Sequence, residues 1–312
     1  MISARRLYRI HLAVALLAGS AVSVAAAAAL TRLQFGLPSG QAIVAACRRV
    51  VPLQSGLAIF LVVALIAMGA MVVALAVRSA LRQIRQQRQA LRTLEALRAT
   101  ELGGRSVTMF RHAGPQAFCA GLLRPRIYVS TAALEMLSPA ELGAVIAHEA
   151  HHQARHDPLR ILSARVLADA LFFLPGLRRL GQRYRELAEL AADEAATRAE
   201  GSRALAAALL TFGGDDEETA ASVVGIAPER VDHLFGQAPR WQLPASVFAI
   251  FAVSLAALLG AVATLPSLAG QGSLSLAALI AEGCMAAMFA LPIAAGALGF
   301  SLSRRWLRRA SA

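Results

Sequence analysis

The sequence predicts a mainly α-helical, polytopic membrane protein with about four transmembrane helices and a mixed α+β domain between the second and the third. Three observations support this fold class. Hydrophobic residues make up 57% of the 312 residues and charged residues only 16%, a more apolar balance than a typical soluble domain has. The apolar residues are gathered in a few long runs, and arginines cluster at the ends of these runs.

The long apolar runs lie near residues 10–30, 57–77, 245–265 and 275–302. Each is long enough for a transmembrane helix, which needs about 20 apolar residues. The first run also fits a secretory signal peptide, because Arg5, Arg6 and Arg9 precede it and small residues occupy positions 25–29. It is longer than the apolar core of a signal peptide, so we expect a retained span, with cleavage as the alternative.

The arginines predict the orientation of the spans. They follow the second run at positions 78–92 and the fourth run at positions 304–309, whereas the stretches near 31–56 and 266–274 hold few. Basic residues accumulate on the cytoplasmic side of membrane proteins. We therefore expect both termini, and the domain between the second and third spans, to face the cytoplasm.

This orientation divides the chain into three parts. We expect two N-terminal transmembrane helices with an external loop in residues 1–77, a cytoplasmic domain in residues 78–240, and two C-terminal transmembrane helices with a basic tail in residues 241–312. The formal net charge is +12, and most of the surplus lies at membrane flanks, where anionic lipid headgroups of the bilayer are the expected partner. No nucleic-acid-binding motif accompanies it, so we expect no direct nucleic-acid partner.

The first part of the cytoplasmic domain is predicted to contain one helix and three strands. An arginine- and glutamine-rich helix is expected over residues 79–100, closed by Gly103 and Gly104. Short strands follow at Val107–Phe110, Gln116–Ala120 and Arg126–Val129, and the last two form a hairpin.

The central helix of the domain is marked at both ends. Ser138 and Glu141 form a predicted capping box with Pro139 at the first helical position. Asp157 and Pro158 interrupt the apolar pattern and end this helix.

This helix carries the run His148-Glu149-Ala150-His151-His152, an H-E-x-x-H motif. His148 and His152 are four residues apart, so on a helix they share one face and can bind one Zn²⁺ ion. Glu149 is placed to act as the base that activates a water molecule. His151 occupies the variable position of the motif and is expected to point away from the metal.

A zinc hydrolase needs a third protein ligand, and the helical stretch 184–194 supplies the candidates. Glu189 and Asp193 are four residues apart and can both face the motif helix. We assign Glu189 as the third ligand and Asp193 as the hydrogen-bond acceptor that orients a ligand histidine. The alternative is a solvated acidic helix face, because Glu186 and Glu194 lie on the same stretch.

Two further groups of residues have weaker implications. Cys47, Cys119 and Cys284 fall in three different parts of the predicted topology, so no intramolecular disulfide is expected. Glu282 is an acid within a predicted span, where it faces either a helix-bundle interior or, by snorkelling, the outer surface.

The spacing H-E-x-x-H followed by E-x-x-x-D resembles the pattern of the gluzincin metallopeptidases. Residues 117–130 and 137–142 resemble the segments that precede the zinc helix in BlaR/MecR-type membrane metallopeptidases, and the resemblance extends over about residues 80–235. It implies a gluzincin-like α+β zinc protease domain in a bacterial inner membrane protein. It further implies that His148, His152 and Glu189 bind zinc and that Glu149 is the catalytic base. The antibiotic-sensing relatives carry an external sensor domain after the last span, and we expect none here.

The sequence therefore predicts a membrane zinc endopeptidase that cleaves a cytoplasmic or membrane-adjacent protein, which the resemblance suggests is a transcriptional regulator. One alternative is a quality-control membrane protease of the HtpX/Ste24 type. Against it, Glu189 follows His152 by only 37 residues with no span between them. The other alternative is a signal-transducing membrane module with a non-catalytic zinc site, for which Glu149 would be unnecessary.

Overall fold

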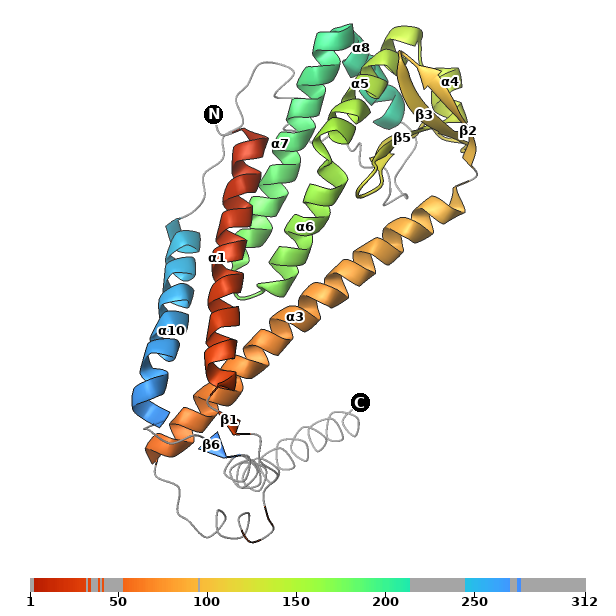
Figure 1. Ribbon diagram of the computed structural model, residues 1–312. Coiled ribbons are helices and arrows are strands. Elements are labelled where there is room, and N and C mark those ends of the chain that lie inside the picture. The colour runs from red at the N-terminus through yellow and green to blue at the C-terminus, as the bar shows by residue number, and fades with distance from the viewer. Residues whose placement is uncertain are drawn as a thin grey trace, which may run out of the picture. The chain divides into compact units, whose positions relative to one another are not determined.

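The computed structural model describes residues 3–31, 33–34, 39, 41, 53–94, 96–213, 245–269 and 274–275. The chain forms two compact units, one made of residues 1–19 and 71–254 and the other of residues 20–70 and 255–312. Figure 1 labels most of the helices and strands. The predicted fourth span, Glu282 and the C-terminal arginines lie outside the described residues.

The described helices are α1 (Ala4–Leu30), α3 (Leu53–Thr93), α4 (Thr131–Met136), α5 (Pro139–Arg155), α6 (Asp157–Ala170), α7 (Pro175–Glu200), α8 (Ser202–Gly213) and α10 (Ala245–Ala269). The strands are β1 (Leu33–Gln34), β2 (Ala96–Leu102), β3 (Arg105–Phe110), β4 (Ala117–Ala120), β5 (Arg126–Ser130) and β6 (Leu274–Ser275). The mainly helical prediction is confirmed, and the strands predicted near β3, β4 and β5 are confirmed.

Two of the described helices are long and apolar enough to cross a membrane. These are Ala4–Leu30, which contains the first predicted run, and Phe60–Thr93, which contains most of the second. The third predicted run is helical as α10, in which the described apolar stretch, Ala249–Ala261, is shorter.

In the second compact unit, α1 and α3 pack through small and branched side chains. Ala25, Ala29, Val62 and Leu65 are buried together. A β-carbon added to Gly69 would lie 2.7 Å from the β-carbon of Ala26, so this glycine is required for the close approach of the two helices.

One predicted element is wrong. Residues 79–100 were expected to form a single helix, but α3 ends at Thr93 and residues 96–102 form β2, which pairs antiparallel with β3. Gly103 (φ 57°) and Gly104 (φ 70°) form the hairpin turn instead of closing a helix. Positive φ at both central residues is what a two-residue hairpin turn needs, and strand pairing outweighs the local helix propensity of the preceding residues.

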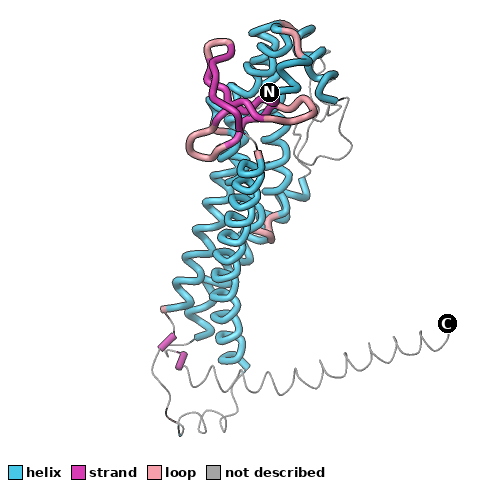
Figure 2. The backbone as a smooth tube through the Cα atoms, turned by 90° about the vertical axis from the view of Figure 1, so that its right-hand side faces the viewer, coloured by secondary structure: helices cyan, strands magenta, loops and turns pink. Residues whose placement is uncertain are grey.

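The first compact unit contains a four-stranded sheet in the order β2-β3-β5-β4. β3 and β5 are parallel, whereas the outer strands pair antiparallel with their neighbours, so β4 lies at one edge. Figure 2 shows these strands as one compact group beside the helices of the unit. Val107, Ile127 and Val129 of the sheet are buried against Val145 and Ile146 of α5.

The limits of α5 confirm the predicted caps. The Ser138 amide donates to Glu141 Oε2 (2.8 Å), and the Glu141 amide donates to Ser138 Oγ (3.4 Å). At the other end His156 adopts a left-handed conformation (φ 55°), and α6 begins directly afterwards at Asp157. The chain therefore turns sharply between α5 and α6, which brings the start of α6 back towards the motif.

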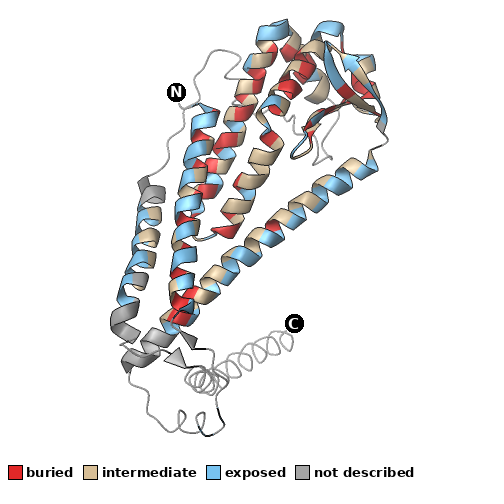
Figure 3. Ribbon diagram, in the orientation of Figure 1, coloured by how far each residue is buried: buried red, intermediate tan, exposed pale blue. Residues whose placement is uncertain are grey.

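The α6–α7 hairpin packs against the N-terminal half of α1, an arrangement that the sequence did not indicate. Leu171, Leu174 and Leu177 form one buried cluster with Leu7 and Ala15 of α1. Figure 3 shows buried residues along α5 and α7, whereas α3 is largely exposed. Helix α7, which carries Glu189, thus shares a core with the N-terminal half of the first predicted span.

Candidate metal centre

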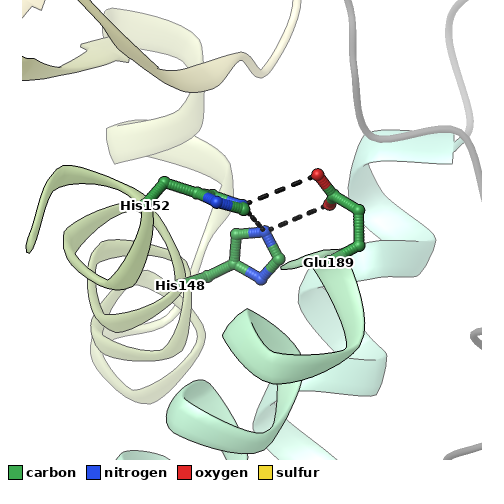
Figure 4. A group of neighbouring side chains, drawn as sticks. All are labelled: His148, His152 and Glu189. Atoms are coloured by element: carbon green, nitrogen blue, oxygen red, sulfur yellow. Dashed lines mark hydrogen bonds and ion pairs between the residues drawn. The ribbon is translucent and has the colours of Figure 1, made fainter. Parts of the chain in front are cut away.

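Three side chains from two helices meet at one point. His148 and His152 project from α5, and Glu189 projects from α7 towards both (Figure 4). The two histidine Nε2 atoms are 3.2 Å apart. Glu189 Oε2 lies 3.5 Å from His148 Nε2, and Glu189 Oε1 lies 3.6 Å from His152 Nε2. The structure therefore brings together the three predicted ligand residues.

These separations fit a tetrahedral zinc site. Zinc binds histidine nitrogen and carboxylate oxygen at about 2.0–2.2 Å, which places neighbouring ligand atoms roughly 3.3–3.5 Å apart. All three ligand atoms lie within 4.8 Å of one another. A cation at their centre would contact both histidine nitrogens and the carboxylate at once.

The outer nitrogen of each ring is held by an aspartate. His148 Nδ1 lies 3.0 Å from Asp193 Oδ1, and His152 Nδ1 lies 2.8 Å from Asp157 Oδ2. Each Nδ1–H donates to its carboxylate, which fixes the ring orientation and leaves Nε2 directed towards Glu189, where it can bind a metal or carry a proton. The sequence predicted this geometry for Asp193.

The contact of Asp157 with His152 was not predicted, because the sequence position of Asp157 suggested only the end of a helix. It is buried, and besides the bond from His152 it accepts a hydrogen bond from the Tyr184 hydroxyl at 2.5 Å. Tyr184 is itself fully buried on α7. The spacing gave no usable signal, since Asp157 follows His152 by five residues and reaches it only through the turn of the chain at His156.

The electrostatics of the site favour positive charge. Burial alone would lower the pKa of His148, but hydrogen bonds to Asp193 and Glu189 and the nearby Glu149 raise it to about 9. Burial likewise opposes ionisation of His152, yet Asp157 and Glu149 raise its pKa above the usual value. Burial would raise the pKa of Asp157, and the bonds from His152 and Tyr184 lower it below its usual range. In the absence of metal, protons take the place of the cation.

A cavity of about 360 Å³ opens onto the triad. Glu149 is 5% exposed and lines this cavity together with His148 and His152. The edge strand β4 forms another wall through Ala117, Phe118 and Cys119. Cys119 is a free thiol, and burial, with Glu149 and Asp157 nearby, raises its pKa to about 12, so it is protonated at neutral pH.

The alternative acidic residues of α7 face elsewhere. Glu186 is exposed and accepts a hydrogen bond from Arg183 at 2.7 Å. Glu194 is also exposed, and neither belongs to the described group of possible metal ligands. His151 and His156 also lie outside that group; His156 is exposed at the turn between α5 and α6.

Comparison with known proteins identifies a family. A family model described as BlaR1 peptidase M56 matches residues 19–229, which is more than half of the chain and includes α5, α6 and α7. No curated protein and no solved structure matches the chain significantly.

Proposed function

The chain belongs to the BlaR1 peptidase M56 family, and from this premise we propose that it is a membrane zinc endopeptidase that cleaves a cytoplasmic or membrane-adjacent protein such as a transcriptional regulator. The observation that carries the proposal is the buried triad of His148, His152 and Glu189 with Glu149 beside it in one cavity. A family of peptidases and a set of residues suited to peptide hydrolysis point to the same chemistry.

In this proposal His148, His152 and Glu189 hold Zn²⁺. Three protein ligands with one open position are typical of catalytic rather than structural zinc. When bound there, zinc supplies Lewis-acid polarisation of a carbonyl and lowers the pKa of water. The carboxylates of Asp157 and Asp193 keep both imidazoles oriented and increase their basicity.

Glu149 performs the proton transfers. Its carboxylate takes a proton from the attacking water and then delivers a proton to the nitrogen of the leaving amine. Its place next to His148 in the sequence and in the cavity keeps it close to the reacting atoms. A structural metal site would have no use for this residue.

The substrate is proposed to bind as an extended segment along β4. This strand is at the edge of the sheet, and no other described strand pairs with its outer side, so a substrate segment can do so in this proposal. β4 lines the cavity that contains the triad, so a segment paired with it would present a peptide bond to Glu149.

The first prediction tests this mechanism through Glu149→Gln in the full chain. The variant should retain zinc, because all three ligands remain, and should lose proteolysis, because the base is gone. Metal analysis of the purified protein and cleavage of peptides or co-expressed proteins measure the two properties. His151→Gln is the matched control from the same helix and should keep both.

Full activity of Glu149→Gln would disprove the role of Glu149. Loss of zinc from this variant would show instead that Glu149 is part of the ligand set. The inactive variant would also retain uncleaved substrate, and the proteins captured with it distinguish a regulator from the misfolded membrane proteins expected for a quality-control protease.

A further inference from the structure

The cavity at the triad also contains two arginines that the mechanism does not use. Arg165 projects from α6 and Arg185 from α7, and both line the cavity that holds His148, Glu149 and Glu189. An adjoining cavity of about 370 Å³, between α3 and the α6–α7 hairpin, is lined by the same two arginines. The two cavities therefore meet at this pair of side chains.

Helix geometry places the pair close to the reacting centre. Arg185 precedes Glu189 by four residues on α7, so the two side chains share a face and lie about one turn, roughly 5–6 Å, apart. Arg165 faces α7 from α6, where its neighbour Ala164 lies against Gly181. An extended substrate advances about 3.3 Å per residue. The two arginines would therefore contact substrate residues within two positions of the scissile bond.

Within the described part of the chain, the pair lacks the acidic partners that neighbouring arginines have. Arg82 and Arg178 form ion pairs with Asp169, at 3.6 Å and 3.3 Å. Among the residues that the structure describes, no carboxylate forms such an ion pair with Arg165 or Arg185. The acid whose charge acts on the pKa of Arg185 is Glu189, and that charge would be committed to the metal.

The two guanidinium groups also repel each other. Burial, followed by the charge of Arg165, holds the pKa of Arg185 below its usual value, although an arginine remains protonated at neutral pH. A carboxylate placed between them would relieve this repulsion and accept several hydrogen bonds. The α3 side of the cavity is uncharged but polar, formed by Gln83, Gln86 and Gln87, so it adds no competing acid.

We propose that Arg165 and Arg185 form a specificity site that selects substrates with an aspartate or glutamate within two residues of the scissile bond. The inference rests on the proposed endopeptidase function and names its substrate class. An anionic lipid headgroup is the other class of ligand that two arginines can bind. The peptide is favoured because both arginines line the same cavity as the triad.

The test uses the full chain, loaded with zinc and purified in an uncharged detergent. A mixed-sequence peptide library is digested and the cleavage sites are identified by mass spectrometry. Selected peptides are then compared with isosteric amides, Glu→Gln or Asp→Asn, at each position within two residues of the cut. We expect the acid to be preferred at one position or more by about 10-fold to 100-fold in kcat/KM.

The arginine variants test the origin of the preference. Arg165→Gln and Arg185→Gln should each reduce it, mainly through KM, while cleavage of the amide peptides changes little. Arg185→Glu should reverse it towards lysine-containing peptides. Arg179→Gln, an exposed position on the same helix that lines neither cavity, is the matched control and should leave the preference unchanged.

Equal cleavage of acid and amide peptides would overturn the specificity site and leave the endopeptidase function intact. A preference for acids that survives both Arg165→Gln and Arg185→Gln would have the same consequence. If no peptide is cleaved, the binding of labelled acidic and amide peptides to Glu149→Gln still tests the site, and equal binding overturns it. Loss of the preference on adding phosphatidylglycerol to the micelles would identify a lipid headgroup site instead.

Discussion

Each ligand histidine is held by a different aspartate from a different part of the chain. Asp193 is one turn beyond Glu189 on α7 and binds His148, whereas Asp157 begins α6 and binds His152. Both carboxylates are buried, with Asp193 1% and Asp157 3% exposed. Burying two acids next to two histidines is costly unless positive charge balances them, and a metal ion or protons on the histidines would supply it.

The second prediction concerns the third ligand. Glu189→Ala should weaken zinc binding far more than Glu186→Ala or Glu194→Ala, because only Glu189 reaches the two histidines. Asp193→Ala should weaken it by about 10-fold to 100-fold, as expected for a residue that orients a ligand. Competition with a chelator measures the zinc affinity of all four variants. A damaging Glu186→Ala would mean that the face of α7 directed at the metal is misassigned.

The third prediction concerns pH. In the metal-free site His148 has its pKa raised to about 9, so at neutral pH zinc must displace a proton to bind. Zinc affinity should therefore rise as the pH increases from 7 to 9 and level off above, by up to about tenfold per pH unit for each proton displaced. Titration calorimetry in buffers of different ionisation enthalpy counts these protons.

Asp193→Asn is the control for this prediction, since it removes the hydrogen bond that contributes most to raising the pKa of His148. The rise in affinity should then shift to lower pH. Zinc affinity that is constant between pH 7 and pH 9 in the unmodified chain would contradict the assignment.

The site was predictable from the sequence where contacts follow helical periodicity. His148, His152, Glu189 and Asp193 all lie at i, i+4 spacings on two helices, and the structure brings their side chains together. Asp157 contacts His152 through a left-handed turn at His156, a conformation that no spacing rule encodes. Arg165 and Arg185 share a cavity only because α6 and α7 pack together, and that packing is a property of the tertiary structure.

Among the elements, those with local signals were predicted from the sequence, and those that depend on pairing or packing were not. Ser138, Pro139 and Glu141 mark the start of α5 by local hydrogen bonds, so the sequence contains the whole signal. β2 exists because it pairs with β3, and its own residues favour a helix. Helices α4 and α8 were not predicted, since each is short and forms part of the packing around α5.

The fourth prediction concerns the hairpin that forms the wall of the cavity. Gly121 has φ +109°, and a β-carbon there would lie 2.8 Å from the carbonyl oxygen of Arg124. Gly121→Ala should therefore destabilise the β4–β5 hairpin by about 1–3 kcal/mol. It should also impair cleavage through KM, because β4 would shift. Thermal inactivation and peptide kinetics measure the two effects.

Gly114→Ala is the matched control, because a β-carbon there meets only the His112 ring at 3.7 Å. Its stability should change by about 0.5 kcal/mol or less. Equal effects of the two substitutions would show that the left-handed backbone at Gly121 is not what limits this hairpin.

At the scale of the whole molecule, the orientation in the membrane remains a prediction based on the arginines. The fifth prediction is that reporter fusions at Ala99 and Ala312 give cytoplasmic signals and a fusion at Gly270 an external one. The physical reason is the cost of moving each basic cluster across the membrane. An external signal at Ala99 would place the metal site outside the cell and redirect the search for substrates to envelope proteins.

The packing of α1 on the α6–α7 hairpin could not be predicted from the sequence. The run that contains Leu7 and Ala15 is apolar enough to face lipid, and nothing local distinguishes a lipid contact from a protein contact. The leucines at the end of the hairpin are equally ambiguous. Only the assembled core shows that these apolar surfaces cover each other.

One contact path joins α1 to the metal site. The ring of Tyr8 lies 5.2 Å from that of Tyr184, whose hydroxyl donates to Asp157, the partner of His152. Thermodynamic linkage makes any coupling along this path reciprocal. If zinc affinity differs by some factor between two positions of α1, then zinc binding shifts the equilibrium between those two positions by the same factor. Metal occupancy and the placement of the first helix would then be two readouts of a single equilibrium.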